Sequence, residues 1–364
     1  MQKLNATLMD ELNRRGISRR SFLQYCVVLA STMGLSPVMA NQLPEKLLNT
    51  KRQSVIWLSF QECTGCAEAI TRADKLTLEN LIFNFISLDY QHTLMAASGS
   101  AAEEAKHNAI EKNKGKYILI VDGSIPIKDG GVYSTVAGET NLDILKRDAK
   151  DAMAIVSLGS CAAFGGLPQA QPNPTGAVSV DEIIKDKPII NIPGCPPIPN
   201  IITGVLAHVL TFGIPTLDQY KRPVAFYGSS VHDNCYRRPF YDKGMFATNF
   251  DDEAARSGWC LYKLGCKGPM THNACAVEKW NGGVSFPIQS GHGCIGCSEK
   301  DFWDSGGFYE SMASPVVSAE TISMAAVAGV GVGVAATALN KIKKAKSLKN
   351  SEPVTIKDLK QEEA

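Results

Sequence analysis

The region 232–297 is dense in side chains that bind soft metal ions. Its many glycines, prolines and aromatic residues show little clean periodicity, so the region cannot build a large apolar core of its own. Thiolates and imidazoles bind zinc and iron–sulfur clusters, and thiols also pair as disulfides. One of these three cross-links must therefore hold the region together. The candidate ligands are spaced as His232-x2-Cys235, Cys260-x5-Cys266, Cys275 and Cys294-x2-Cys297.

Four further cysteines follow apolar runs that are typical of buried strands. Cys63 and Cys66 follow the run 55–60, and two other runs are each followed by a single cysteine, Cys161 or Cys195. The carboxyl ends of parallel strands meet at one edge of a sheet, where open α/β sheets hold their ligands. We therefore expect these four thiols to converge on one site. The disulfide alternative requires neighbouring thiols to pair within that edge.

The elements that must position these residues alternate between apolar runs and helix-compatible segments. This alternation predicts an α/β fold with a doubly wound parallel sheet, in a domain spanning 41–226. No glycine-rich phosphate-binding motif accompanies the strands, so nucleotide binding has no support. The alternation stops near Tyr227, and residues 227–312 form a second, irregular domain. The expected strands are 55–60, 81–88, 117–121, 152–158 and 188–192.

The N-terminus has the order of features found in an export signal. Arg19-Arg20 stands within Ser-Arg-Arg-Ser-Phe-Leu, a weakly apolar run covers 25–35, and Val38-Met39-Ala40 offers a cleavage site. Residues 1–40 are thus predicted to be a twin-arginine signal peptide outside the fold; the alternative is a basic helix start that contains Arg-Arg. Removal of this leader takes away Cys26, and ten of the 11 cysteines remain. An even count invites disulfides in an exported protein, but a route for already folded proteins favours a cofactor.

The C-terminus carries an uncharged run of Ala, Val and Gly over 322–339. About 18 helical residues span about 27 Å, just enough to cross a bilayer. The lysines that follow predict a cytoplasmic end, and Gly329 and Gly333 offer a small face for another membrane helix. The alternative is a buried or frayed tail. Residues 313–321 are then a linker, 322–340 a transmembrane helix and 341–364 a cytoplasmic tail. The net charge of +1 argues against a nucleic-acid partner.

The ten remaining cysteines and one histidine divide into three ligand sets. Zinc fits the first two sets, whereas three lone thiolates fit a cluster that lacks one iron. Soft thiolate ligands favour iron–sulfur clusters, which without a substrate pocket would carry electrons. His232 joins the second set because it stands three residues before Cys235 and that set needs a fourth ligand. The other histidines keep ordinary roles and could hydrogen-bond near clusters: His92, His107, His208, His272 and His292. The sets are Cys63, Cys66, Cys161 and Cys195; His232, Cys235, Cys260 and Cys266; and Cys275, Cys294 and Cys297.

These motifs together closely resemble the small subunit of a membrane-bound, periplasm-facing nickel–iron uptake hydrogenase. The resemblance covers nearly the whole chain and includes the twin-arginine signal. It implies a flavodoxin-like domain with a proximal 4Fe–4S cluster on the first set. A second domain would carry a distal 4Fe–4S cluster on the second set and a medial 3Fe–4S cluster on the third. Pro287 stands where a fourth medial ligand would be. The motifs are Glu62-Cys63-Thr64-Gly65-Cys66, Gly159-Ser160-Cys161, Pro193-Gly194-Cys195-Pro196-Pro197 and Gly291-His292-Gly293-Cys294-Ile295-Gly296-Cys297.

The resemblance also implies partners and a location. The nickel–iron centre would lie in a separate large subunit, so this chain holds no catalytic residue. Electrons would pass from the proximal to the medial to the distal cluster, and then to a membrane cytochrome b and quinone. A dimer of heterodimers at the periplasmic face of the inner membrane is expected. Glu62 would help at the subunit interface or make a plain polar contact.

One departure from part of the family concerns oxygen. Oxygen-tolerant relatives carry two extra cysteines around the proximal cluster, and the matching positions here are Gly65 and Gly166. We therefore expect an ordinary four-cysteine cluster and an oxygen-sensitive enzyme. Two other hypotheses remain open. One is a stand-alone periplasmic electron carrier; the other is a disulfide-stapled binding protein, which would be colourless.

Overall fold

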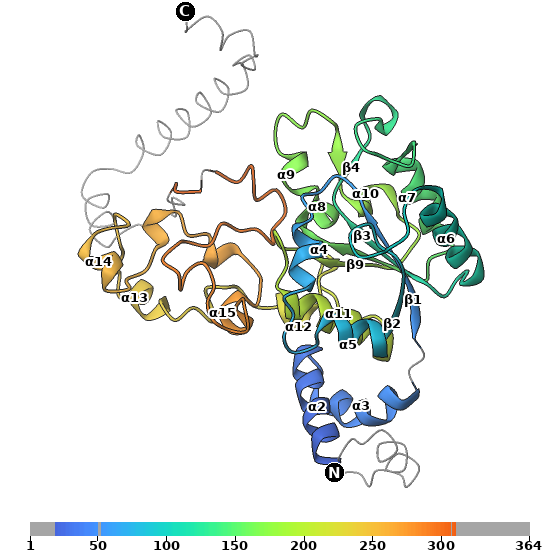
Figure 1. The fold of residues 1–364 in the computed structure, drawn as a ribbon. Coiled ribbons are helices and arrows are strands. Elements are labelled where there is room, and N and C mark those ends of the chain that lie inside the picture. The colour runs from blue at the N-terminus through green and yellow to red at the C-terminus, as the bar shows by residue number, and fades with distance from the viewer. Residues whose placement is uncertain (1–18, 50–51, 307, 311–364) are drawn as a thin grey trace, which may run out of the picture. The chain divides into compact units, whose positions relative to one another are not determined.

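A five-stranded parallel sheet organises the first half of the chain (Figure 1). The computed structural model describes residues 19–49, 52–306 and 308–310. The strand order is β2-β1-β3-β7-β9, which is the order of flavodoxin-type doubly wound sheets. The parallel α/β sheet predicted from the sequence is therefore confirmed. Its strands are β1 (Gln53–Ser59), β2 (Ile86–Tyr90), β3 (Ile118–Asp122), β7 (Ala154–Leu158) and β9 (Ile189–Ile192).

The strands form where β-branched and aromatic residues run together, because both faces of the sheet are covered. Every residue of β3, β7 and β9 is buried. Trp57, Ile120 and Val156 stand side by side in register across three strands. Each buried aliphatic side chain of this kind contributes about 1.5–3 kcal/mol to folding.

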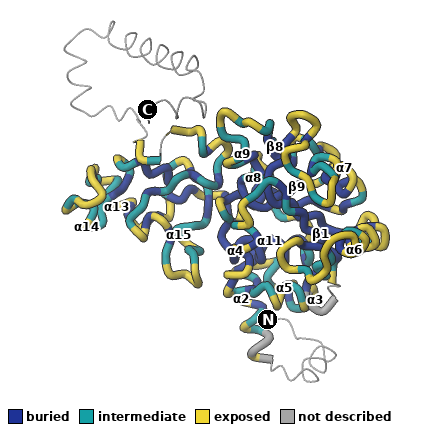
Figure 2. Tube along the Cα trace, turned by 45° about the horizontal axis from the view of Figure 1, so that its top comes forward, coloured by how far each residue is buried: buried dark blue, intermediate teal, exposed yellow. Residues whose placement is uncertain are grey.

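Helices cover both faces of the sheet and create two apolar cores. On one face α11 (Pro199–Phe212), α4 (Gly65–Ile70) and α5 (Leu78–Asn84) pack over Trp57, Ile120 and their neighbours. On the other face α6 (Gly99–Lys112) and α7 (Asn141–Ala149) cover the alternate strand residues. Figure 2 shows burial concentrated in the sheet and α11, with exposed residues on α6. The remaining elements here are β4 (Ile125–Pro126), η1 (Lys128–Gly131), β5 (Thr135–Val136), β6 (Glu139–Thr140), α8 (Gly159–Phe164), α9 (Gly166–Gln169), β8 (Ala177–Val178) and α10 (Val180–Ile183).

The strand expected over 81–88 is wrong in its first half. Residues 78–84 form α5, and β2 begins only at Ile86. The helix starts because the Thr77 hydroxyl caps it by accepting a hydrogen bond from the Asn80 N–H at 3.3 Å. Leu81 then packs into the core from a helix instead of a strand. An apolar run of this length does not distinguish the two structures.

The N-terminal segment lies on the core of the uncut chain. Helices α2 (Arg19–Thr32) and α3 (Pro37–Asn49) pack against α11, and both bury apolar side chains such as Leu29 and Leu43. The Thr32 carbonyl approaches Gly204 so closely that a Cβ there would lie 1.9 Å away. In the full-length chain the segment thus packs on the sheet domain. The removal of residues 1–40 as a signal peptide stays a prediction.

Short helices and loops make up the rest of the described chain. A small core of Val231, Leu261, Phe286 and Ile288, joined by buried cysteines, holds them together. No described helix is long and apolar enough to cross a membrane. The predicted linker 313–321, membrane helix 322–340 and tail 341–364 lie outside the described residues. The elements are α12 (Val224–Tyr227), α13 (Arg238–Asp242), α14 (Glu253–Arg256), η2 (Tyr262–Leu264), η3 (Gly268–Met270) and α15 (Cys275–Glu278).

Candidate iron–sulfur cluster sites

The first ligand set gathers at the carboxyl edge of the sheet. Cys63 and Cys66 follow β1, Cys161 lies in α8 directly after β7, and Cys195 lies between β9 and α11. The Cys66 thiol interacts electrostatically with those of Cys161 and Cys195, and Cys63 interacts with the same two thiols. The fold thus brings together four thiols that the sequence holds far apart.

Glycines make room for these thiols. Gly159 has a φ of +82°, and a Cβ there would lie 2.4 Å from the Cys66 sulfur. Gly166 has a φ of +57°, and its Cβ would lie 2.7 Å from the Cys161 sulfur. Real side chains do not approach this closely, so both positions require glycine for space as well as for backbone conformation. The thiols therefore line a space that any side chain at these two glycine positions would occupy.

A buried carboxyl group, Asp122, lies beside the first set at the end of β3. Burial, and then the neighbouring Glu62 carboxylate, raise the pKa of Asp122 to about 8. The side chain faces the Cys66 thiol. Glu62 is half-buried next to Cys63 and accepts a hydrogen bond from the Thr64 hydroxyl at 3.3 Å. The predicted strand 117–121 stops just before Asp122, and no sequence signal connected this residue with the thiols.

The second ligand set lines one cavity in the cysteine-rich region. The His232 ring packs edge-on against Tyr241, with ring centroids 4.6 Å apart. Burial, and then the charge of Arg238, lower the pKa of His232. This shift favours the neutral imidazole, which is the form that binds a metal. The predicted ligands His232, Cys235, Cys260 and Cys266 all lie on the cavity wall.

The third ligand set lies between the other two in space. Cys275 begins α15, and its thiol interacts electrostatically with those of Cys294 and Cys297. The Cys294 thiol donates to the Thr271 hydroxyl at 3.4 Å, and the Trp280 indole N–H faces the Cys275 thiol. Pro287 is exposed, and its carbonyl accepts the His292 N–H at 2.9 Å.

The donor set fits iron–sulfur clusters. Every one of the cysteines is free in the structure, so no disulfide joins them. Within the described residues no three His, Cys, Asp or Glu side chains converge closely enough for a single metal ion. Two thiolates on one zinc ion stand about 3.8 Å apart, whereas the ligands of a cluster bind different iron atoms and stand farther apart. Burial raises the pKa of most of these thiols, so iron binding would release their protons.

The other histidines divide between the two regions. His92 bonds to the Tyr90 hydroxyl at 2.8 Å and His208 to the Gly213 carbonyl at 3.1 Å, both away from the thiols. His107 stands on α6 near Glu103. His272 and His292 lie in the loops that carry the third ligand set.

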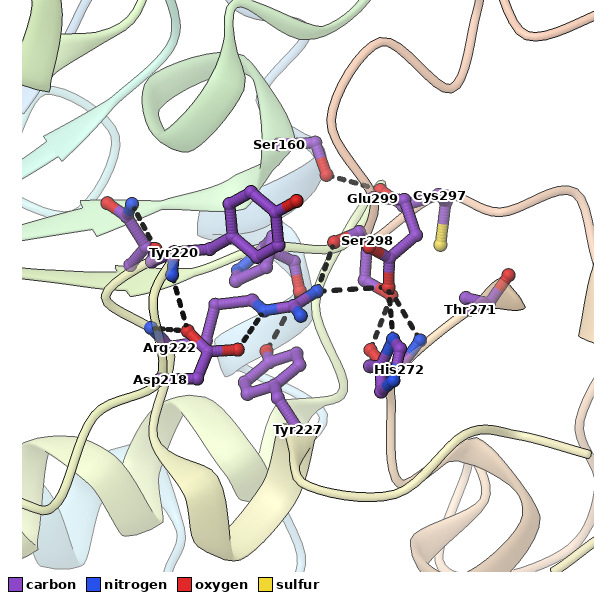
Figure 3. A network of polar contacts seen from close by, with 12 residues as sticks. Ser160, Asp218, Tyr220, Arg222, Tyr227, Thr271, His272, Cys297, Ser298 and Glu299 are labelled. Carbon is purple, nitrogen blue, oxygen red and sulfur yellow. Dashed lines mark hydrogen bonds and ion pairs between the residues drawn. The ribbon is translucent and has the colours of Figure 1, made fainter. Parts of the chain in front are cut away.

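A polar network fastens the sheet domain to the cysteine-rich loops (Figure 3). The Arg222 guanidinium is only 2% exposed and donates to Asp218 at 2.8 Å and to Glu299 at 3.0 Å. Glu299 also accepts the His272 N–H at 2.6 Å. Separately, the Ser160 hydroxyl donates to the Cys297 carbonyl. No sequence signal revealed the contacts of Arg222 with Glu299 or of Ser160 with Cys297, because these partners lie far apart in the chain.

Comparisons with known proteins show the family of this chain. Residues 227–310 match the family described as the C-terminal part of the NiFe/NiFeSe hydrogenase small subunit. Residues 63–209 match the family described as NADH ubiquinone oxidoreductase, 20 Kd subunit. The uptake hydrogenase small subunit of Azotobacter vinelandii is 47% identical over 91% of this chain and 94% of its own length. The hydrogenase-1 small chain of Escherichia coli is 44% identical, covering 92% of each chain.

Solved structures show the same relationship. The reduced, active Ni-Fe-Se hydrogenase of Desulfomicrobium baculatum matches 72% of this chain and 100% of its own, with a TM-score of 0.68 and 34% identity. The actinobacterial-type NiFe-hydrogenase of Ralstonia eutropha matches 84% of this chain and 92% of its own, with a TM-score of 0.65 and 25% identity. The fold and these relatives define an electron-transfer subunit of an oxidoreductase. The chain belongs to the small subunits of NiFe hydrogenases, which pair with a large subunit.

Proposed function

We propose that this subunit passes electrons from hydrogen oxidation in the large subunit to a membrane cytochrome b and quinone. The observation that carries the proposal is the series arrangement of the three ligand sets. The Ser160 hydroxyl, next to Cys161, donates to the Cys297 carbonyl, and the Cys195 backbone N–H faces the Cys297 sulfur, which connects the first set with the third. The Cys294 N–H donates to the Cys266 sulfur at 3.3 Å, which connects the third set with the second. This series of contacts suits electron transfer from the first ligand set to the third and then to the second.

The assignment of clusters follows from the ligands. Four thiolates at the first set suit a proximal 4Fe–4S cluster, and three thiolates with one imidazole suit a distal 4Fe–4S cluster. The third set offers three thiolates, and Pro287 supplies no ligand atom, which suits a medial 3Fe–4S cluster. Each cluster, when bound, accepts and releases one electron. The chain's own residues hold the clusters, exclude water and set their hydrogen bonds.

Hydrogen activation belongs to the partner in this proposal. Every cysteine after Cys26 is used by the three ligand sets, so no thiolate is left for a nickel–iron centre. Glu62 lies beside the first set and suits the interface with the large subunit. A second copy of the heterodimer completes the assembly. A stand-alone carrier is the alternative, and purification of this chain without a large subunit would favour it.

The proposed location is the periplasmic face of the inner membrane. Export by the twin-arginine pathway is supported by Arg19-Arg20 and the small residues up to Ala40. The uncharged run 322–339 and the lysines after it support a membrane anchor with a cytoplasmic end. Fractionation of cells that express a tagged chain tests this location. Recovery of the folded protein in the cytosolic fraction would contradict it.

Electron paramagnetic resonance of the oxidised, membrane-extracted complex tests the electron-transfer proposal. We expect a 3Fe–4S signal of about one spin per chain, because one set has three ligands. Two further clusters should appear when hydrogen reduces the complex. A spectrum without iron–sulfur signals in either state would contradict the proposal and return the cysteines to other roles.

We also propose that the enzyme is oxygen-sensitive, because the first set has only four thiols. The two positions where tolerant relatives carry cysteines are Gly65 and Gly166, and a Cβ at Gly166 would collide with Cys161. Hydrogen oxidation should therefore stop in air and recover only slowly after air is removed. A film assay on an electrode measures this directly. Sustained activity during steady exposure to air would contradict the proposal.

A further inference from the structure

Cys297 contacts two segments that carry ligands of the first set, one at Ser160 and one at Cys195. Its carbonyl accepts a hydrogen bond from the Ser160 hydroxyl, and Ser160 directly precedes Cys161. The backbone N–H of Cys195 faces its sulfur and lowers the pKa of the Cys297 thiol, against the larger effect of burial. The Ser160 oxygen also accepts the Gly194 N–H at 2.9 Å, so one hydroxyl joins both loops to Cys297. Figure 3 shows Ser160 reaching across from the sheet domain toward Cys297.

We propose that Ser160 is a positioning residue for electron transfer between the first and third ligand sets. This inference rests on the proposed function. Electron transfer slows steeply when a bonded route is replaced by a gap through space. The Ser160 hydroxyl supplies such a route, from Cys161 through its own side chain to the carbonyl of Cys297. Ser160 is 1% exposed, so water has no access to take over its role.

A second contact between the domains is of a different kind. Arg222 and Glu299 draw the same loops together, but their ion pair ends on Ser298 and His272 and on no ligand of the first set. Between the third and second sets the contact is a backbone N–H on sulfur, with no crossing between domains. Ser160 therefore links the segment of Cys161 directly to Cys297 in the other domain.

The loss of the hydroxyl should change a reduction potential in a defined direction. A hydrogen bond to sulfur stabilises the reduced cluster, which carries more negative charge, and so raises its potential. Without Ser160 holding the carbonyl, Cys297 is free to move away from the Cys195 N–H. The potential of the cluster on the third set should then fall. Transfer from the first set should slow as well.

The experiment compares three variants of the purified heterodimer. Ser160→Ala removes the hydroxyl, and Ser160→Thr retains it. Ser157→Ala is the matched control, because Ser157 is equally buried on β7 and its hydroxyl has no partner among the described residues. We expect Ser160→Ala alone to lower the potential of the 3Fe–4S signal in a redox titration followed by paramagnetic resonance. In the same variant, the reduced cluster on the first set should also enhance the spin relaxation of the 3Fe–4S cluster less strongly. Ser160→Thr should restore both.

The outcomes separate this inference from the proposed function. Wild-type protein without iron–sulfur signals would contradict the function itself. Wild-type signals together with an unchanged potential and relaxation in Ser160→Ala would overturn the role of Ser160 alone. Should Ser160→Ala bind no iron, proton double resonance on the wild-type 3Fe–4S cluster decides. A coupled amide proton that resists exchange in deuterated water supports the contact with Cys195. Only rapidly exchanging protons there would overturn the inference.

Discussion

At the scale of single residues, the first ligand set depends on the smallest side chain. We expect Gly159→Ala to lose iron at that set only, because its methyl group would occupy space 2.4 Å from the Cys66 sulfur. A residue other than glycine at positive φ also costs about 1–2 kcal/mol. Iron per chain and the paramagnetic signals of the reduced protein measure the loss. The signals of the second and third sets should persist.

A matched variant separates crowding from backbone strain. Gly138 has the same φ of +82°, but a Cβ there would meet nothing within 4 Å. Gly138→Ala should therefore carry the strain and keep its full iron content. Equal iron loss in both variants would mean that backbone conformation, and not space for Cys66, makes glycine necessary at position 159.

The candidate cluster ligands could be predicted from the sequence, whereas the residues that position those ligands could not. Spacing such as Cys294-x2-Cys297 identifies ligands because nearby thiols must share one group. Ser160 and Arg222 carry no such local signal, since each meets its partners only after the two domains have folded together. Asp122 directly follows a predicted strand, but its contact with Cys66 depends on the sheet order.

At the scale of elements, apolar runs predicted the sheet because buried parallel strands need them on both faces. The runs for β3, β7 and β9 agree with the structure to within two residues. The run at 81–88 failed because a capped helix and a buried strand present similar residues over so short a length. The segments that follow β1, β7 and β9 then place thiols at one edge, as parallel order requires.

At the scale of the whole molecule, the two domains rely on different sources of stability. The sheet domain has two large apolar cores, whereas the cysteine-rich region has one small core that includes Cys235 and Cys266. Protein made without iron should therefore be cut rapidly by protease within 227–310, and its sheet domain should stay protected. Limited proteolysis with mass spectrometry measures both rates.

The iron-loaded protein is the control for that measurement. Protection of residues 227–310 should return when iron and sulfide are restored. Cleavage at equal rates in both domains, with or without iron, would show that the small core is sufficient and that the clusters add little to stability.

The two contacts between ligand sets have a consequence for how this protein can change over generations. Both use a backbone N–H, from Cys195 and from Cys294, and every residue except proline provides that group. Substitution of either donor residue, except by proline, therefore leaves the donor group in place. Ser160 is different, because its hydroxyl is a side-chain group that a single substitution removes. Substitution at that position is therefore the most direct way for inherited variation to alter the electron route between the domains.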